Sequence, residues 1–187
     1  MKYIFSKIIL LFISLIVIIY ITTDCNSKIY GKPIWSCPYN EERLKNLYIP
    51  ESDGKYTSQS LFDIYSFTHI SHGILLFYIL RYIYKKKNEK MIYISIIYAI
   101  ILEFIWEIIE NLPITIERYR KTNKLARDYE GDSIINSIGD ILSMIIGFII
   151  AWYYPDYGYS LFIANELVLY YFIKDNLVMN IYQIFIK

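Results

Sequence analysis

Five apolar stretches constrain the fold of this chain more than any other feature. They cover residues 3–23, 67–84, 91–112, 132–154 and 157–174. Each approaches the roughly 20 residues that a helix needs to cross the hydrocarbon core of a bilayer. Hydrophobic residues form 56% of the chain, which is high for a soluble domain. The sequence therefore predicts an all-α fold, a polytopic membrane bundle with about five transmembrane helices.

The spacing of these stretches divides the chain into three parts. We expect an N-terminal transmembrane anchor at 1–23, an extracytoplasmic segment at 24–66, and a four-helix transmembrane core with a C-terminal tail at 67–187. A basic start and apolar core would also suit a cleaved signal peptide. The residues ITTDCNS that follow lack a clear A-x-A cleavage site, which favours a retained anchor.

Basic residues in the loops predict the orientation in a bacterial inner membrane. Positive charge is concentrated near the N-terminus, at Lys2 and Lys7, and in the loop 81–90. The N-terminus and this loop are therefore expected in the cytoplasm. The loop 113–131 then lies outside although it is also basic, so either the topology is wrong or its arginines have a function. Cys25 and Cys37 fall on the outer, oxidising side, where they either form a disulfide or stay unpaired.

Polar residues gather at the outer ends of four of these stretches. His69 and His72 open the second, and Asp175 and Asn176 follow the fifth. At about 100° per residue, each row of the third and fourth stretches falls on one helix face. Antiparallel packing would stack the two rows in layers. The rows are Glu103, Glu107 and Glu110 in the third stretch, and Asp132, Asn136 and Asp140 in the fourth.

So many acids within a membrane need compensation, because each charged side chain there costs free energy. Three solutions remain open: protonated acids that hydrogen-bond, pairing with histidines or with Arg118 and Arg120, or a bound divalent cation. The alternative is a purely structural role, in which these residues form a hydrogen-bond network that joins the helices and binds no ligand. In that reading Asp132 is the N-cap of the fourth stretch.

Several strings resemble a bacterial membrane family known as UPF0314 or DUF2585. These are TSQSLFDIYSFTHISHG, EFIWEIIENLPITIERYR, DYEGDSIINSIGD and KDNLVMN, with GKPIW at 31–35. The resemblance covers about residues 30–180 and implies a multi-pass membrane protein, but this family has no established activity. A looser likeness to VanZ-like membrane proteins would involve Asp63 or the histidines, Glu107 with Arg118 or Arg120, and Asp132–Asn136–Gly139.

Our leading hypothesis is an outward-facing site that binds or processes a lipid or lipid-linked anion. Guanidinium groups suit phosphate or carboxylate, and paired carboxylates suit Mg²⁺ or Mn²⁺, so a divalent metal is the cofactor considered. The alternatives are a cation- or proton-coupled transporter and a non-catalytic accessory protein. The candidate catalytic residues are His69, His72, Glu107 and Asp132, and the candidate binding residues are Glu103, Glu110, Asn111, Arg118, Arg120, Asn136, Asp140, Asp175 and Asn176.

The expected partners are membrane lipids. The net charge of +1 and the lack of an aromatic-basic platform indicate no nucleic-acid partner. The chain carries no glycine-rich nucleotide loop and no GxSxG elbow. The sequence predicts no oligomeric state.

Overall fold

The structure is a computed structural model that describes residues 57–84, 89–123 and 126–186, and three short strands before them. These strands are β1 (Lys28–Ile29), β2 (Lys32–Pro33) and β3 (Tyr48–Ile49). β1 pairs with β2 in antiparallel fashion, and β3 pairs in parallel with β4 (Phe62–Asp63). The predicted anchor at 1–23, Cys25 and Cys37 lie outside the described residues.

The described part of the chain is otherwise helical, as predicted. Four of the predicted spans coincide closely with long helices. The helices are α2 (Ser66–Tyr84), α3 (Glu89–Glu110), α4 (Pro113–Thr122), α5 (Ile134–Tyr153), α6 (Gly158–Ile173) and α7 (Leu177–Phe185).

Two of these helices are long and apolar enough to cross a membrane. They are α3, over Ile92–Glu110, and α5, over Ile134–Tyr153, whereas α6 is apolar but shorter. The buried core helix of a soluble protein meets the same criterion, so this finding is weak evidence for a membrane. The predicted count of about five transmembrane helices is not confirmed in the described residues.

Helix α4 lies where the sequence predicted only a loop, at 113–131. Pro113 occupies the first turn, where its missing N–H costs nothing, and Asn123 follows the last residue. Its sequence PITIERYRKT carries too much charge for a hydropathy search to detect it. This short helix places its basic residues beside the polar end of the bundle.

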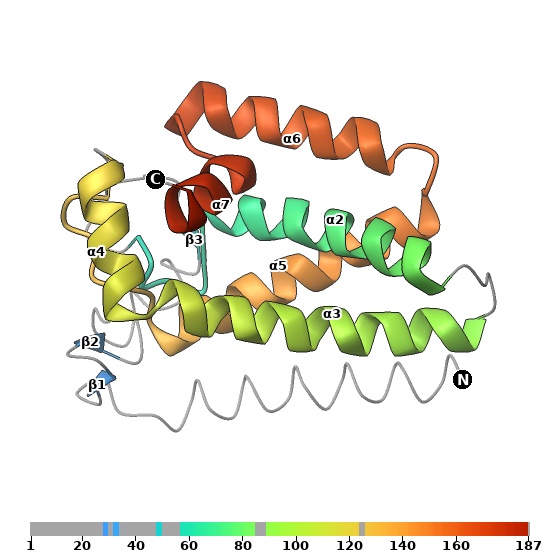
Figure 1. Ribbon diagram of the computed structural model, residues 1–187, viewed down its shortest axis with the longest axis horizontal. Coiled ribbons are helices and arrows are strands. Elements are labelled where there is room, and N and C mark those ends of the chain that lie inside the picture. Colours follow the sequence, from blue (N-terminus) through green and yellow to red (C-terminus); the bar gives the residue numbers. More distant parts are fainter. Residues whose placement is uncertain are drawn as a thin grey trace.

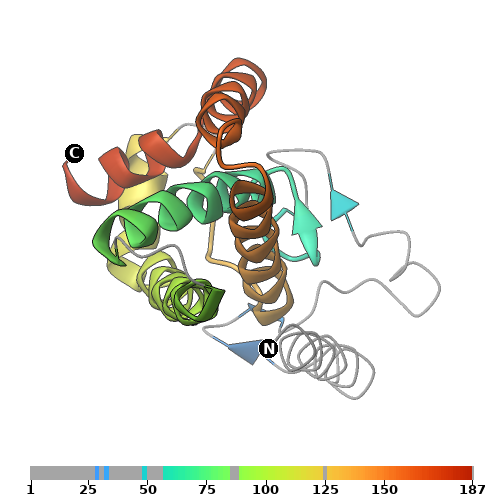
Figure 2. The same ribbon diagram turned by 90° about the vertical axis from the view of Figure 1, so that its right-hand side faces the viewer.

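Helix α2 lies at the centre, packed against α3, α5 and α6 (Figures 1 and 2). Its tightest contact is with α5, where glycine lets the backbones touch. A Cβ atom on Gly73 would lie 1.9 Å from the carbonyl oxygen of Met144, and one on Gly147 would lie 2.0 Å from that of Ile70. Small residues allow such close approach between helices.

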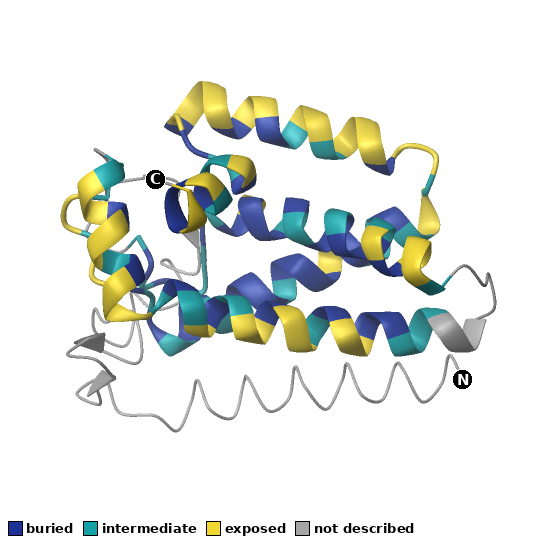
Figure 3. Cartoon of the chain, viewed as in Figure 1, coloured by how far each residue is buried: buried dark blue, intermediate teal, exposed yellow. Residues whose placement is uncertain are grey.

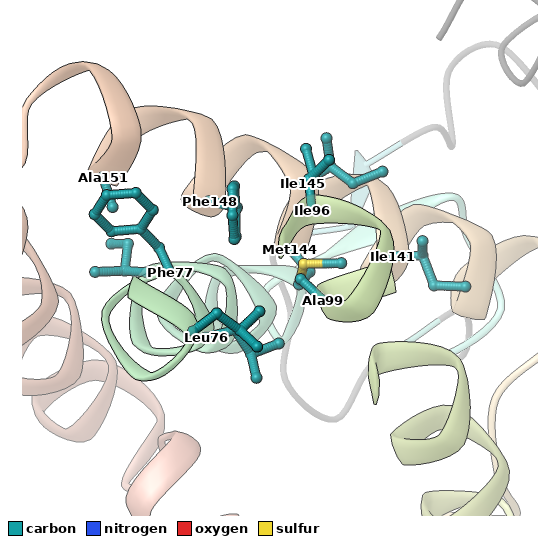
Figure 4. Packing of buried hydrophobic residues seen from close by; sticks show 11 residues of the cluster. Leu76, Phe77, Ile96, Ala99, Ile141, Met144, Ile145, Phe148 and Ala151 are labelled. Carbon is teal, nitrogen blue, oxygen red and sulfur yellow. The ribbon is translucent and has the colours of Figure 1, made fainter. Parts of the chain in front are cut away.

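A hydrophobic core fills the interior of the bundle next to the histidines of α2 (Figure 4). Ile74 of α2 and Met144 and Phe148 of α5 are completely buried there. Ala99 of α3 is also completely buried and belongs to the same cluster. This core holds α2, α3 and α5 in register and thereby positions the polar residues that adjoin it on the same three helices.

The outer faces of α3 and α6 remain apolar and exposed (Figure 3). On α3 these residues include Ile97, Ile101, Leu102, Phe104, Ile105 and Ile108, and on α6 they include Leu161, Ile163, Leu167, Val168, Tyr171 and Phe172. Contiguous exposed apolar surface of this kind marks contact with lipid or with another protein.

Candidate functional site

His69 and His72 lie in the first two turns of α2, whose N-terminus is held by Asp63. The buried carboxylate of Asp63 accepts hydrogen bonds from the backbone N–H groups of Ser58 (2.7 Å) and Tyr65 (2.8 Å). Burial raises the pKa of Asp63 to about 6, against the opposing effect of these N–H donors. This capping fixes the orientation from which both imidazoles enter the bundle.

The imidazole of His69 lies between the two predicted acidic rows. Its Nδ1 atom is 2.6 Å from Oε1 of Glu103 and 3.5 Å from Oε1 of Glu107. Its Nε2 atom faces the other way, 3.8 Å from Oδ2 of Asp140. The structure therefore brings the rows of α3 and α5 together around a histidine of α2, rather than stacking them directly.

His72 meets the second oxygen of the same glutamate. Its Nδ1 atom lies 2.6 Å from Oε2 of Glu103, which is fully buried, and the two groups form an ion pair when the imidazole is protonated. One carboxylate thus contacts two imidazoles. The ring of Trp106 packs edge-on against His72 at 5.2 Å, and Phe185 of α7 lies 6.4 Å beyond it.

A chain of polar contacts continues from the histidines along α5. The Ser66 hydroxyl donates to Oδ1 of Asp140 at 2.8 Å and accepts from the backbone N–H of Asp63 at 3.2 Å. The amide of Asn136 donates to Oδ2 of Asp63 at 3.4 Å. Asn136 and Asp140 therefore join one buried network with His69.

Glu107 and Glu110 complete the row on α3 but differ in their contacts. Within the described residues, neither carboxylate oxygen of the buried Glu107 has a hydrogen-bond partner. Glu110 accepts a hydrogen bond of 2.9 Å from the hydroxyl of Tyr119 on α4. Burial, with the nearby carboxylate of Glu110, raises the pKa of Tyr119 well above its ordinary value, so this phenol stays a donor.

Asp132 lies at the rim, and its predicted role as the N-cap is wrong. Helix α5 begins at Ile134, so the capping position falls on Ser133, whose Oγ accepts from the backbone N–H of Asn136 at 3.2 Å. Asp132 instead accepts hydrogen bonds from Tyr129 (2.7 Å) and Asn111 (3.2 Å). The predicted residues Asn111 and Asp132 therefore tie the end of α3 to the start of α5.

Arg118 and Arg120 are exposed on α4 and do not reach the acidic row. The Arg118 guanidinium donates to the backbone carbonyl of Ile184 in α7, and Arg120 donates to that of Tyr129 at 2.5 Å. Among the described residues, the ion pairs of the glutamates on α3 are formed with histidine. The arginines lie at the edge of the polar end instead.

Asp175 and Asn176 belong to a second polar cluster, at the junction of α6 and α7. Asn176 caps α7 by accepting from the backbone N–H of Met179 at 2.9 Å. The buried carboxylate of Asp175 accepts from Asn123 at 2.6 Å, and burial raises its pKa to about 7. The hydrogen bonds of these two predicted residues connect α4, α6 and α7, and among the described residues none of them involves a histidine.

Sequence reasoning missed three residues that contribute to these clusters. Ser66 links Asp63 to Asp140, Tyr119 binds Glu110, and Glu166 of α6 accepts from the backbone N–H of Val178 at 3.1 Å. Glu166 could have been found, because it is the one carboxylate within the apolar stretch 157–174. Ser66 lies one helical turn before His69 and therefore shares its face.

Two sets of side chains offer donor atoms close enough for a metal ion. In each set the atoms lie within 4.8 Å of one another: His69, His72 and Glu103 in one, and His69, Glu107 and Glu110 in the other. Imidazole nitrogen combined with carboxylate oxygen suits first-row transition metals.

A comparison with known protein families identifies the family of this chain. Residues 31–186 match the family described as "Protein of unknown function (DUF2585)". The chain belongs to the DUF2585 family. The match includes both histidines and every acid of the DUF2585 site described above, and it confirms the resemblance stated from the sequence.

Curated relatives of this DUF2585 chain carry the name UPF0314. A UPF0314 protein of Sphingopyxis alaskensis is 40% identical over 128 residues, covering 66% of this chain and 64% of the relative. A UPF0314 protein of Agrobacterium fabrum is 35% identical over 150 residues, covering 80% of this chain and 71% of the relative. The chain thus spans somewhat less than two thirds of the Sphingopyxis protein. The comparisons do not show the looser likeness to VanZ-like proteins, and no solved structure matches.

Proposed function

We propose that this DUF2585 protein is a multi-pass protein of the bacterial cell membrane that binds or processes a lipid or lipid-linked anion. One observation carries the proposal: His69, Glu103, Glu107 and Asp140 are buried together at one end of an otherwise apolar bundle. Ionisable groups within membrane proteins are expensive and commonly mark a functional site. A network that only joined helices would leave no carboxylate as poorly satisfied as that of Glu107.

The exposed apolar surface supports placement in a membrane. Lipid is a suitable environment for the outer faces of α3 and α6, which water would solvate poorly. Helices α2 and α3 run in opposite directions (Figure 1), so the end of α2 that carries Arg81 and the end that carries the histidines belong to opposite ends of the bundle. With the Arg81 end of α2 in the cytoplasm, the polar site faces outward.

The exposed basic helix α4 supports an anionic ligand. Arg118 and Arg120 lie beside the polar end, and both residues are exposed. Planar guanidinium groups bind phosphate and carboxylate through paired hydrogen bonds. A lipid headgroup held there would lie at the edge of the site that contains His69, His72, Glu107 and Asp132.

The transporter alternative receives less support from the packing. Directly past the histidines, the interior is filled by Ile74, Met144 and Phe148, each with 0% exposure (Figure 4). A continuous ion path would have to displace this core. The accessory-protein alternative would use the apolar tail 177–187 and Trp106 as contact surface, which lipid would cover equally well.

The test is a lipid analysis of a bacterial strain that lacks its own DUF2585 gene. We expect an anionic lipid or lipid-linked intermediate to change in abundance, and wild-type protein to restore it. Glu107→Gln at equal membrane abundance should not restore it, whereas the exposed control Glu117→Gln should. An unchanged lipid profile, or full restoration by Glu107→Gln, would contradict the proposal.

A further inference from the structure

The site around His69 has an electrostatic problem that the proposed function must solve. Glu103, Glu107, Glu110 and Asp140 surround two imidazoles, and among the described residues no lysine or arginine pairs with them. Even with both histidines protonated, four ionised acids would leave negative charge in a medium that screens it poorly. Such a site would repel the anionic ligand proposed above.

We propose that His69, His72 and Glu103 hold a divalent transition-metal ion, with Glu107 as a further ligand. The inference rests on the proposed function only in that the same site is involved. Donor atoms of His69, His72 and Glu103 already lie within 4.8 Å of one another, drawn from two helices that the core holds rigidly. A dication there neutralises the acids and offers a positive centre to an anionic headgroup.

Unsatisfied donor atoms provide the second, independent observation. Within the described residues, neither carboxylate oxygen of the buried Glu107 has a hydrogen-bond partner. Nδ1 of His72 and Oε2 of Glu103 contact each other at 2.6 Å and make no hydrogen bond elsewhere among these residues. Buried polar atoms without partners are rare in native proteins, and an ion is one established reason for them. Glu107 is 5% exposed, and its Oε1 atom lies 3.5 Å from Nδ1 of His69, so it points into the site.

The donor set selects the class of metal. Two imidazole nitrogens with carboxylate oxygens favour Zn²⁺, Mn²⁺ or Fe²⁺ over Ca²⁺ and Mg²⁺, which prefer oxygen ligands alone. The junction cluster around Asp175 differs in this respect, because its described partners are amide groups of Asn123 and Gln183 and it contains no histidine.

Neighbouring groups hold the ligands in place, as metal sites require. The carboxylate of Asp140 lies 3.8 Å from Nε2 of His69, opposite the Nδ1 atom that faces Glu103. Ser66 in turn donates to Asp140 at 2.8 Å, which fixes that carboxylate. Asp140 is therefore a positioning residue for His69 rather than a ligand.

Elemental analysis of detergent-purified full-length protein tests the proposal. Wild-type protein expressed with Zn²⁺, Mn²⁺ and Fe²⁺ present should carry about one equivalent of a single transition metal, since both possible ligand sets share His69. His72→Ala should lose most of it, and Asp175→Asn, a buried acid outside the site, should retain it. A wild-type protein free of transition metal would contradict the site.

Co²⁺ titration covers the case in which His72→Ala fails to fold. Chelator-treated wild type should bind about one Co²⁺ and show the visible absorption of cobalt held by nitrogen and oxygen ligands. Zn²⁺ should displace it. Absence of Co²⁺ binding to folded wild type would overturn the proposal. If the protein binds metal but the deletion strain has an unchanged lipid profile, only the proposed function is contradicted. If the lipid profile changes but the purified protein binds no metal, only the metal site is contradicted.

Discussion

Asp175 is buried by folding at the junction of α4, α6 and α7, and its protonation should make stability depend on pH. Burial raises its pKa from 3.8 to about 7, with Glu166 as the nearby acid that adds to the effect. The folded state then binds a proton that the unfolded state releases, so this contribution is complete below pH 4 and is lost as pH rises through 7. We expect thermal stability in detergent to fall between about pH 4 and 7.

Replacement of Asp175 by Asn identifies the source of that slope. The amide cannot ionise, so Asp175→Asn should reduce the decline in melting temperature between about pH 4 and 7, with buried Asp63, whose pKa is also raised, contributing part of what remains. The exposed Asp156→Asn is the matched control and should leave the decline unchanged. An equally steep decline in Asp175→Asn would show that another group is responsible.

Ser133 provides a second test at a single residue. Its Oγ caps α5, so Ser133→Ala should reduce stability by about 1 kcal/mol. Ser160→Ala, an exposed serine within α6, should have little effect. Thermal unfolding of both variants measures the difference. An effect of Ser133→Ala no larger than that of Ser160→Ala would show that the cap contributes nothing.

The cap of α5 shows how well the sequence predicts the role of a single residue. Aspartate and serine both make good caps, and Asp132 and Ser133 are adjacent. Pattern alone therefore predicted the right helix end but chose the wrong residue. The contact of Asp132 with Asn111, 21 positions earlier, depends on how α3 returns beside α5 and is invisible in the local pattern.

The packing of α2 against α5 depends on glycine. A Cβ atom on Gly73 would lie 1.9 Å from a backbone carbonyl, which cannot move aside without separating the helices. Gly73→Ala should therefore abolish or severely reduce folded protein, measured as monodisperse yield and melting temperature. Gly158→Ala is the control and should cost less, since its Cβ atom would meet the side chain of Tyr78 rather than the backbone of another helix. Equal yields from both variants would contradict the close packing.

Hydropathy predicted the long helices well, because α3, α5 and α6 are each apolar along most of their length. It missed α4, whose charged residues resemble a loop, and it predicted the segment of α7 only as a C-terminal tail. The arrangement in space was less predictable. The acidic rows of α3 and α5 were expected to meet directly, whereas α2 carries His69 between them.

The whole molecule should respond to its surroundings as a membrane protein does. Ile101 lies on the exposed face of α3, with 48% of its surface accessible. In lipid, Ile101→Asp should reduce membrane insertion, because an acid at the helix centre costs about 2.5–3.5 kcal/mol. The fraction of protein that resists alkaline extraction of membranes measures this. Wild-type protein recovered in the soluble fraction would contradict the membrane placement.

The candidate site was predictable in composition and only partly in geometry. His69, His72 and the acids of α3 and α5 stood out because charge is unusual in apolar stretches, and most of them do converge. Asp175 and Asn176 stood out for the same reason but belong to a separate cluster. The sequence alone could not separate the two groups, because their separation depends on how α6 and α7 pack onto the bundle.

The central claim is that the buried acids around His69 serve a ligand rather than hold the helices together. Thermal unfolding of chelator-treated Glu107→Met beside wild type tests it most directly, with the exposed Glu117→Met as control. Removal of a buried, unsatisfied carboxylate should raise the melting temperature by at least about 2 °C. A melting temperature clearly below that of wild type would mean that Glu107 stabilises the fold, and would contradict the account.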